Sequence, residues 1–241
     1  MGIIPADDPT IHQGTIPAWS YSVLKDFATC PYRIFLSKIK RIRIGQNEAM
    51  LRGIEIHQIC EQYLKGIVLE LPESLQPWES LLDKMREGVS EGNVFPECEL
   101  AFDKEWTRCA WFGDTCWFRA KADVIIKEDE TSYQIIDWKT GRQHGNEFAH
   151  SQQLQYYAVA LGMAYPAAEF IKGTIYYLDQ KVGAKLEKTY DRETISMFLP
   201  KVNQRGLAIT EKTEWHATPS DSACRWCNYK DTGDCQYAIN F

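Results

Sequence analysis

The 241-residue sequence lacks several features that would place it in a specialised class of protein. Its most apolar uncharged stretch, residues 156–168, is too short to span a membrane and contains Pro166. Met1–Asp8 shows no basic segment followed by an apolar one, so we expect no secretory signal. Repeats, low-complexity tracts and a G-x-x-x-x-G-K-[ST] phosphate loop are also absent. These absences predict a soluble, cytoplasmic protein without a motor of its own.

Positive charge is also in short supply. The chain has 27 Lys and Arg against 33 Asp and Glu, a formal net charge of -6. This balance provides no global attraction for nucleic acid, but it leaves local basic patches possible. Because no secretory signal is expected, the eight cysteines are more readily explained as metal ligands or buried thiols than as four disulfides.

Hydrophobic periodicity predicts helices first and strands afterwards. The expected helices lie at about 20–38 (bent at Pro31), 49–65, 77–88, 148–163 and from an Asp191 cap to about Leu207. The expected strands lie at 99–108, 116–127, 132–138 and 171–178, and residues 217–241 are expected to form a cysteine-bearing loop region. This order predicts an α/β or α+β class with a mixed sheet.

The most informative segment is Asp137-Trp138-Lys139, which follows two isoleucines. At the end of a strand, a spacing of two places Asp137 and Lys139 on one face. Phosphodiester hydrolysis can use that geometry, because a carboxylate can hold a divalent metal while a nearby ammonium polarises water or neutralises phosphate charge. The Trp138 carbonyl can supply another oxygen ligand. Taken alone, this pattern is more often a surface salt bridge.

Neighbouring segments add weight to the nuclease interpretation. Asp123 ends a segment that we expect to pair with the strand at 132–138. Antiparallel pairing would bring Asp123 and Asp137 within metal-sharing distance, and hard oxygen ligands suit Mg²⁺ or Mn²⁺.

Two helical segments carry further candidates. His57 lies on an expected helix, and Gln153 and Tyr157 lie one turn apart on another, as a DNA-facing pair requires. The ordinary alternatives are a hydrogen-bonded helix histidine, and a surface glutamine beside a core tyrosine.

These segments together resemble the PD-(D/E)xK nuclease superfamily, and within it the RecB-type branch, which includes nuclease domains of recombination helicases and CRISPR-adaptation nucleases. The resemblance is carried, in order, by Gly53-x-x-x-His57, Asp123, Asp137-Trp138-Lys139-Thr140-Gly141 and Gln153-x-x-x-Tyr157. One small departure is Ala120, where the family often has glycine.

The resemblance implies a role for each matched residue. It implies metal ligands at His57, Asp123, Asp137 and the Trp138 carbonyl. It makes Asp123, Asp137 and Lys139 the catalytic residues, and it assigns positioning of the DNA strand to Gln153 and Tyr157.

The cysteines form a second constellation. Cys224-Arg225-Trp226-Cys227 is a C-x-x-C motif, followed by Cys235, with Cys30 far upstream. The residues alone allow a redox pair, a zinc site or an iron–sulfur anchor, although the terminal loop context disfavours a thioredoxin-like role. The layout is similar to that of iron–sulfur RecB-type nucleases, which implies a [4Fe–4S] cluster on Cys30, Cys224, Cys227 and Cys235, with zinc as the alternative. Cys60, Cys98, Cys109 and Cys116 are expected in the core.

The expected fold is therefore α/β, a restriction-endonuclease-like mixed sheet flanked by helices, with an N-terminal helical region and a C-terminal cysteine segment closed by a metal cluster. We expect one nuclease domain over residues 1–241: a helical region with the His motif (20–95), the catalytic sheet and Gln/Tyr helix (96–180), and the C-terminal helix and cluster segment (181–241).

The expected activity is that of a Mg²⁺- or Mn²⁺-dependent DNA exonuclease acting on single strands or ends, in recombination, repair, CRISPR adaptation or phage DNA metabolism. A helicase or recombination protein is a candidate partner, and no membrane association is expected. The alternatives are a DNA-end binding or assembly subunit with little cleavage of its own, and a structure-specific endonuclease.

Overall fold

The computed structural model describes residues 11–239, so Met1–Asp8, where the sequence shows no secretory signal, lies outside the described residues. The chain divides into two compact units. The larger unit is Gln46–Val202, and the smaller one combines the chain before Gln46 with the chain from Asn203 onward. Each unit is described below by itself.

The larger unit is built on a five-stranded mixed sheet. Its strands, in spatial order, are β2 (Val94–Phe102), β3 (Phe118–Lys127), β4 (Ser132–Lys139), β5 (Phe170–Tyr177) and β6 (Lys185–Asp191). Neighbours run antiparallel except β4 and β5, which are parallel. The predicted mixed sheet flanked by helices is thus confirmed.

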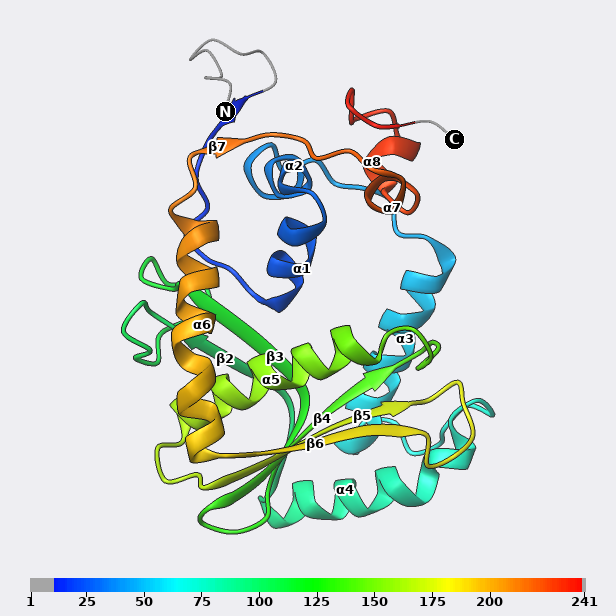
Figure 1. Cartoon of the computed structure of the whole chain (residues 1–241). Coiled ribbons are helices and arrows are strands. Elements are labelled where there is room, and N and C mark those ends of the chain that lie inside the picture. The colour runs from blue at the N-terminus through cyan, green and yellow to red at the C-terminus, as the bar shows by residue number, and fades with distance from the viewer. Residues whose placement is uncertain (1–10, 240–241) are drawn as a thin grey trace. The chain divides into compact units, whose positions relative to one another are not determined.

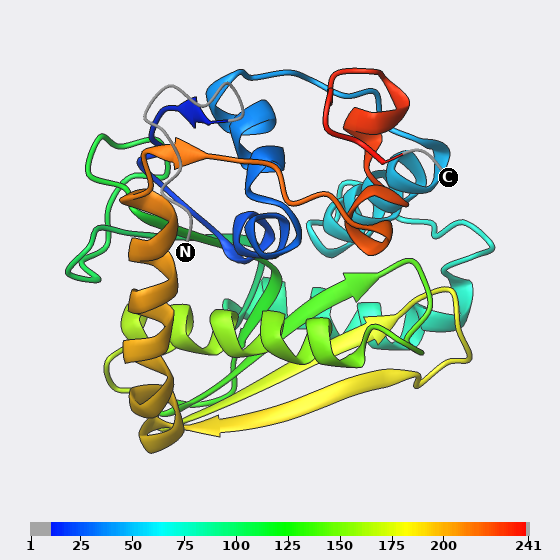
Figure 2. The same cartoon turned by 45° about the horizontal axis from the view of Figure 1, so that its top comes forward.

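Helices cover both faces of this sheet (Figures 1 and 2). They are α3 (Glu48–Leu64), the 3₁₀ turn η2 (Gln76–Trp78), α4 (Glu79–Glu91) and α5 (Glu147–Ala164). A further helix, α6 (Arg192–Thr210), begins in this unit and ends in the other. As predicted, Asp191 caps α6: its carboxylate accepts a hydrogen bond from the Thr194 N–H at 2.8 Å.

Alternation along β4 separates the core from the chemistry. Ile136 and Trp138 are buried in the hydrophobic cluster formed with α3 and α4, which includes Cys60 and Leu82. Because successive strand residues point to opposite faces, Asp137 faces the α5 side. Strand β4 therefore contributes Ile136 and Trp138 to the hydrophobic core on one face and the Asp137 carboxylate on the other.

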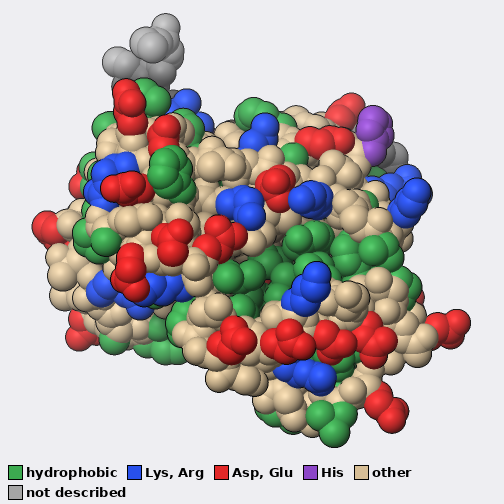
Figure 3. All heavy atoms as spheres, turned by 90° about the horizontal axis from the view of Figure 1, so that it is seen from below, with side chains coloured by type: hydrophobic (Ala, Val, Ile, Leu, Met, Phe, Trp, Pro, Cys, Tyr) green, Lys and Arg blue, Asp and Glu red, His purple; other side chains and the backbone are tan. Residues whose placement is uncertain are grey.

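The packing of α4 on the sheet leaves a cavity of about 280 Å³. Leu81, Met85, Val94, Ile126 and Tyr176 supply its apolar lining. Figure 3 shows the molecule from the α4 side, where hydrophobic side chains gather beside acidic ones. Although α4 carries several acidic residues, this face of the larger unit therefore combines acidic and hydrophobic side chains.

The smaller unit pairs the two ends of the described chain. Strand β1 (His12–Gln13) lies antiparallel to β7 (Glu214–Trp215), and the buried Trp215 indole donates a 2.8 Å hydrogen bond to the Gly14 carbonyl. Its remaining elements are α1 (Tyr21–Thr29), α2 (Pro31–Ile34), the π-helical turn η1 (Phe35–Ile39), α7 (Asp221–Cys224) and α8 (Asn228–Asp231).

Two expected elements differ from those observed. The helix expected at 20–38 is interrupted at Cys30, which has φ -163° and ψ 113°, because the residue before a proline is disfavoured in the helical region. The strand expected at 99–108 instead spans Val94–Phe102. Pro96 lies inside it, and an edge strand tolerates a proline because one side of the strand has no ladder to complete.

Close packing of α5 on β5 gives a first prediction. A Cβ added at Gly173 would lie 3.0 Å from a Leu154 side-chain carbon, so Gly173→Val must push α5 away from the sheet. We expect a loss of about 1–3 kcal/mol in the free energy of unfolding, measured by urea denaturation. Gly45→Ala is the control, since no atom lies within 4 Å of its added Cβ. Equal stability of the two variants would contradict this packing.

Candidate active site

Strand pairing brings two carboxylates together in the larger unit. The register pairs Val124 of β3 with Ile136 of β4, so Asp123 and Asp137 are the next residues along the two strands. The Trp138 N–H donates a 2.6 Å hydrogen bond to Asp123 Oδ2. The sequence expectation that antiparallel strands would juxtapose Asp123 and Asp137 therefore agrees with the structure.

Helix α3 adds His57 to this pair. His57 Nδ1 lies 3.0 Å from Asp123 Oδ1. Four residues before it, a Cβ at Gly53 would lie 3.2 Å from Thr140 Oγ1, so the absence of a side chain there lets the helix approach the turn that follows Lys139. The Gly53-x-x-x-His57 spacing thus combines close approach with a side chain directed at Asp123.

Asp137 is the most deeply buried acid of the site, with 3% of its surface exposed. Its Oδ1 accepts hydrogen bonds from Gln153 Nε2 at 2.9 Å and from the Tyr157 hydroxyl at 3.2 Å. Its Oδ2 forms an ion pair with Lys139 Nζ. Within residues 11–239, however, this buried Oδ2 has no hydrogen-bond partner. The ion pair with Lys139 is therefore the one interaction that Asp137 Oδ2 makes among the described residues.

Burial and like charge shape the protonation of the site. Burial and the neighbouring charge of Asp137 raise the pKa of the Asp123 carboxyl, and the contacts to His57 and the Trp138 N–H oppose that rise. Burial alone would lower the pKa of His57, but the hydrogen bond and charge of Asp123 outweigh it, so the net shift is upward. The surroundings of Asp123 thus favour a bound proton or a bound cation at this carboxyl.

Gln153 and Tyr157 contact the carboxylate directly. Gln153 Nε2 also donates to the Tyr157 hydroxyl at 2.9 Å, and the Lys121 carbonyl, 2.8 Å from that hydroxyl, competes with Asp137 Oδ1 for its single proton. Burial, followed by the charges of Asp137 and Asp123, raises the pKa of Tyr157 well above its ordinary value, so it stays a neutral donor. The pair orients Asp137, and its role in positioning DNA stays a prediction.

One neighbour of the site escaped the sequence analysis. Glu97 lies between the register pairs Pro96–Val124 and Cys98–Ala122, and it forms an ion pair with Lys121. Its φ of 56° is in the left-handed region, which costs a non-glycine residue about 1–2 kcal/mol. No sequence signal marks a left-handed glutamate inside a strand, so only the structure could place Glu97 beside Lys121 of β3.

The donor set suits a hard divalent cation. Two carboxylates and an imidazole are available, and the buried Asp137 Oδ2 is an acceptor that lacks a hydrogen bond from the described residues. Nowhere in the described part of the chain do three His, Cys, Asp or Glu side chains already surround a point that could hold a metal ion. His57 contacts Asp123 and Lys139 contacts Asp137, and both contacts would have to rearrange around a cation.

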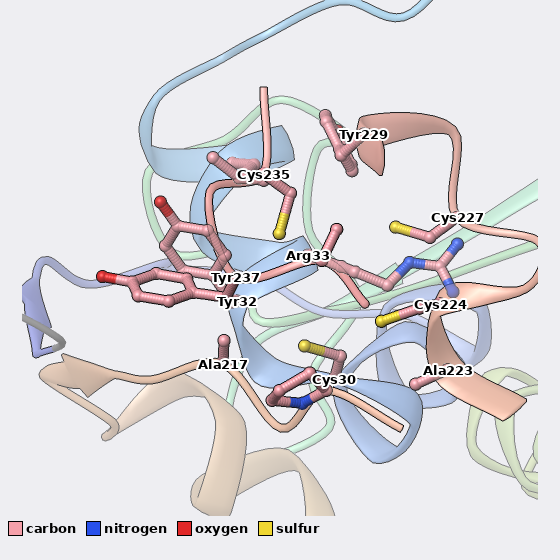
Figure 4. Close-up of a pocket in the computed structure, with 13 residues that line it drawn as sticks. Cys30, Tyr32, Arg33, Ala217, Ala223, Cys224, Cys227, Tyr229, Cys235 and Tyr237 are labelled. Atoms are coloured by element: carbon pink, nitrogen blue, oxygen red, sulfur yellow. The ribbon is translucent and has the colours of Figure 1, made fainter. Parts of the chain in front are cut away.

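The four cysteines singled out by the sequence line one pocket of the smaller unit. Cys30 comes from the break between α1 and α2, Cys224 and Cys227 flank the end of α7, and Cys235 follows α8. Figure 4 shows their sulfur atoms around a common space. Cys30, Cys224 and Cys227 are buried, whereas Cys235 is half-buried. The pocket therefore presents four soft donors from distant parts of the sequence.

The sulfurs share their surroundings. The Thr218 N–H donates a 3.4 Å hydrogen bond to Cys30 Sγ. Burial raises the pKa of the Cys235 thiol, and the other three cysteines add to that rise. Of the remaining cysteines, Cys60 and Cys116 are buried, and burial raises the pKa of Cys60 to about 12, while Cys98 and Cys109 are half-buried.

Comparison with known proteins gives one family match. The profile of the PD-(D/E)XK nuclease superfamily matches residues 18–111 and 78–232. A search of curated proteins finds no match to this chain.

Three solved structures show limited similarity. The crystal structure of SSO0001 has 18% identity and a TM-score of 0.48, covering 95% of this chain and 91% of that one. LHK-Exo in complex with dAMP has 14% identity, a TM-score of 0.38 and coverages of 81% and 88%. An alkaline exonuclease (LHK-Exo) from Laribacter hongkongensis has 12% identity, a TM-score of 0.32 and coverages of 82% and 93%.

The His57–Asp123 contact gives a second prediction. Asp123→Asn removes the negative charge that outweighs burial, so the pKa of His57 should fall in the metal-free protein. An NMR titration of the His57 Cε1–H resonance measures it. Asp179→Asn is the matched control, because Asp179 contacts Arg52 on the same helix and not His57. An unchanged His57 pKa in Asp123→Asn would show that another group sets it.

Proposed function

This chain belongs to the PD-(D/E)XK nuclease superfamily, and we propose that it hydrolyses phosphodiester bonds in DNA as a divalent-metal-dependent exonuclease. One observation carries the proposal: the half-buried Asp123 and the buried Asp137 lie side by side on β3 and β4, the Lys139 ammonium contacts Asp137, and one Asp137 oxygen has no hydrogen bond from the described residues. Buried carboxylates without full hydrogen bonding are costly, and retaining them suits a cation site.

We assign the cation to Asp123, Asp137, His57 and the Trp138 carbonyl, with Mg²⁺ or Mn²⁺ as the expected ion. A bound cation of this class activates water and offsets charge on the phosphate. The protein's own side chains orient the carboxylate that would bind this cation. Gln153 and Tyr157 hold Asp137 Oδ1, which leaves Oδ2 turned toward Lys139.

Lys139 carries the second part of the mechanism. Its ammonium lies against Asp137 Oδ2 at the end of β4, with about a quarter of the side chain exposed. From there Nζ can hold the attacking water or neutralise the extra negative charge that develops on the phosphate during attack. In the cation-free protein, the contact with Asp137 holds the ammonium at the site.

The preferred substrate is single-stranded DNA or a DNA end. A chain with a net charge of -6 is poorly suited to a broad duplex-binding face, which relies on many cationic contacts to phosphates. A single strand can instead thread past a small site. Membership in the RecB-type branch, roles in recombination, repair, CRISPR adaptation or phage DNA metabolism, and a helicase or recombination partner belong to the same proposal. No helix between residues 11 and 239 has the length and apolarity needed to cross a bilayer.

The third prediction concerns cleavage itself. End-labelled single- and double-stranded DNA should be degraded with Mn²⁺ or Mg²⁺ and left intact with EDTA. Lys139→Ala should slow cleavage at least about a hundredfold, because it removes the group that meets transition-state charge. Asp179→Asn, which disrupts an ion pair between Arg52 of α3 and the segment that follows β5, should cleave like the wild type. Cleavage that persists in Lys139→Ala would contradict the assignment.

Two further experiments separate this function from the two alternatives. A DNA-end binding or assembly subunit would retain DNA binding and function in Asp137→Ala, whereas the nuclease loses its activity. A structure-specific endonuclease would cut circular single strands, whereas an exonuclease requires a free end. The intact acid–lysine set favours catalysis over binding alone.

We also propose that Cys30, Cys224, Cys227 and Cys235 bind a [4Fe–4S] cluster, with zinc as the alternative. Support comes from the four sulfurs lining one pocket and from the Thr218 N–H directed at Cys30 Sγ. When bound, such a group cross-links the segment after Thr29 to the segment after Ser222. Its role is structural, because hydrolysis transfers no electrons.

The fourth prediction tests this site by metal content. Protein purified anaerobically should contain iron and acid-labile sulfide, and Cys227→Ser should lose most of both with a lower melting temperature. Cys98→Ser is the control, since Cys98 donates to the Phe95 carbonyl and lies outside the pocket. Zinc without iron would select the alternative metal. Neither metal in the wild type would refute the site.

A further inference from the structure

One cation faces the four cysteines. Arg33 is the one charged residue among the described residues that line their pocket, and its carbons and guanidinium extend along the pocket beside the sulfurs (Figure 4). Arg33 follows Cys30 by three residues within α2, and its backbone N–H donates to the Cys30 carbonyl at 3.0 Å. The helix that begins after Cys30 therefore determines where Arg33 lies.

The two ends of the Arg33 guanidinium have different surroundings. Nη2 forms an ion pair with Asp26 Oδ1 of α1 at 3.2 Å, in a partly exposed position. Nε is buried, and no hydrogen-bond partner for it exists within the described chain. Because a buried N–H group without a hydrogen-bond partner destabilises the fold, the protein retains an unfavourable donor at the cysteine pocket.

A metal group held by four thiolates would supply a hydrogen-bond acceptor for Arg33 Nε. Zn²⁺ with four thiolates is anionic, and the charge and sulfur hydrogen bonding of an iron–sulfur cluster set its reduction potential. An N–H⁺ donor beside such a group gains a partner and offsets negative charge in a site with low solvent access. Asp26 forms an ion pair with Nη2 of the guanidinium, whereas Nε remains available to the group that the cysteines would hold.

We propose that Arg33 is a positioning residue that stabilises the anionic metal group on Cys30, Cys224, Cys227 and Cys235 through its Nε N–H and its charge. This inference rests on the proposed four-cysteine site, and it is independent of the catalytic carboxylates. Because both candidate metal groups are anionic, the role of Arg33 is the same for iron–sulfur and for zinc.

The fifth prediction compares three variants of the anaerobically purified full chain: Arg33→Met, Arg33→Lys and Arg225→Met. Arg225 neighbours Cys224 in sequence but is exposed and outside the pocket, so it controls for charge removal nearby. The measurement is the rate of metal release to a chelator, iron or zinc as the protein contains. Arg33→Met should release metal about ten- to a hundredfold faster, as is typical when a ligand-supporting contact is lost. Arg33→Lys should fall between it and the wild type, and Arg225→Met should match the wild type.

A second measurement separates this role from a merely structural one. If the metal is an iron–sulfur cluster, its reduction potential should shift to a more negative value in Arg33→Met, because a lost positive charge disfavours the reduced state. Should Arg33→Met fail to fold, Arg33→Lys must still show the intermediate release rate. Equal release rates in wild type and folded Arg33 variants would overturn the inference alone. A wild type without metal would overturn it together with the four-cysteine site.

Discussion

The pairing of two carboxylates, the half-buried Asp123 and the buried Asp137, is the constraint on which the rest of the larger unit depends. Two like charges in a poorly solvated place repel each other, and water cannot screen them. The surrounding residues supply the compensation: His57 and the Trp138 N–H on one acid, Lys139, Gln153 and Tyr157 on the other. Every one of these contacts brings a donor or a positive charge.

The sheet makes this arrangement possible. The register of β3 on β4 fixes which residues meet, and a slip of one residue would turn every side chain of a strand to the opposite face. The helices then complete the site from both sides: α3 contributes His57, and α5 contributes Gln153 and Tyr157. Gly53 and Gly173 permit the close approaches that place these helices. The hydrophobic core and the chemistry thus depend on the same alternation along β4.

The sequence predicted best what depends on short spacings. The Asp137–Lys139 spacing and the helix bearing Gln153 and Tyr157 are local patterns, and both elements form where expected. By contrast, β6 escaped prediction because it is an edge strand with one buried residue, Tyr190, so no alternation of apolar residues marks it. The hydrogen bonds of Tyr157 to Asp137 and Lys121 could not be read from the sequence, because they depend on tertiary packing.

The most direct test of the account is a titration of the metal-free protein with Mn²⁺, in which electron paramagnetic resonance measures the bound and free ion. If the buried acids form a cation site, the wild type should bind Mn²⁺ saturably. Binding should weaken as the pH falls, because a raised Asp123 pKa lets protons compete with the ion. Asp137→Asn should weaken binding at least about tenfold, as expected when a charged ligand is lost. Equal Mn²⁺ binding in Asp137→Asn and wild type would contradict the central claim.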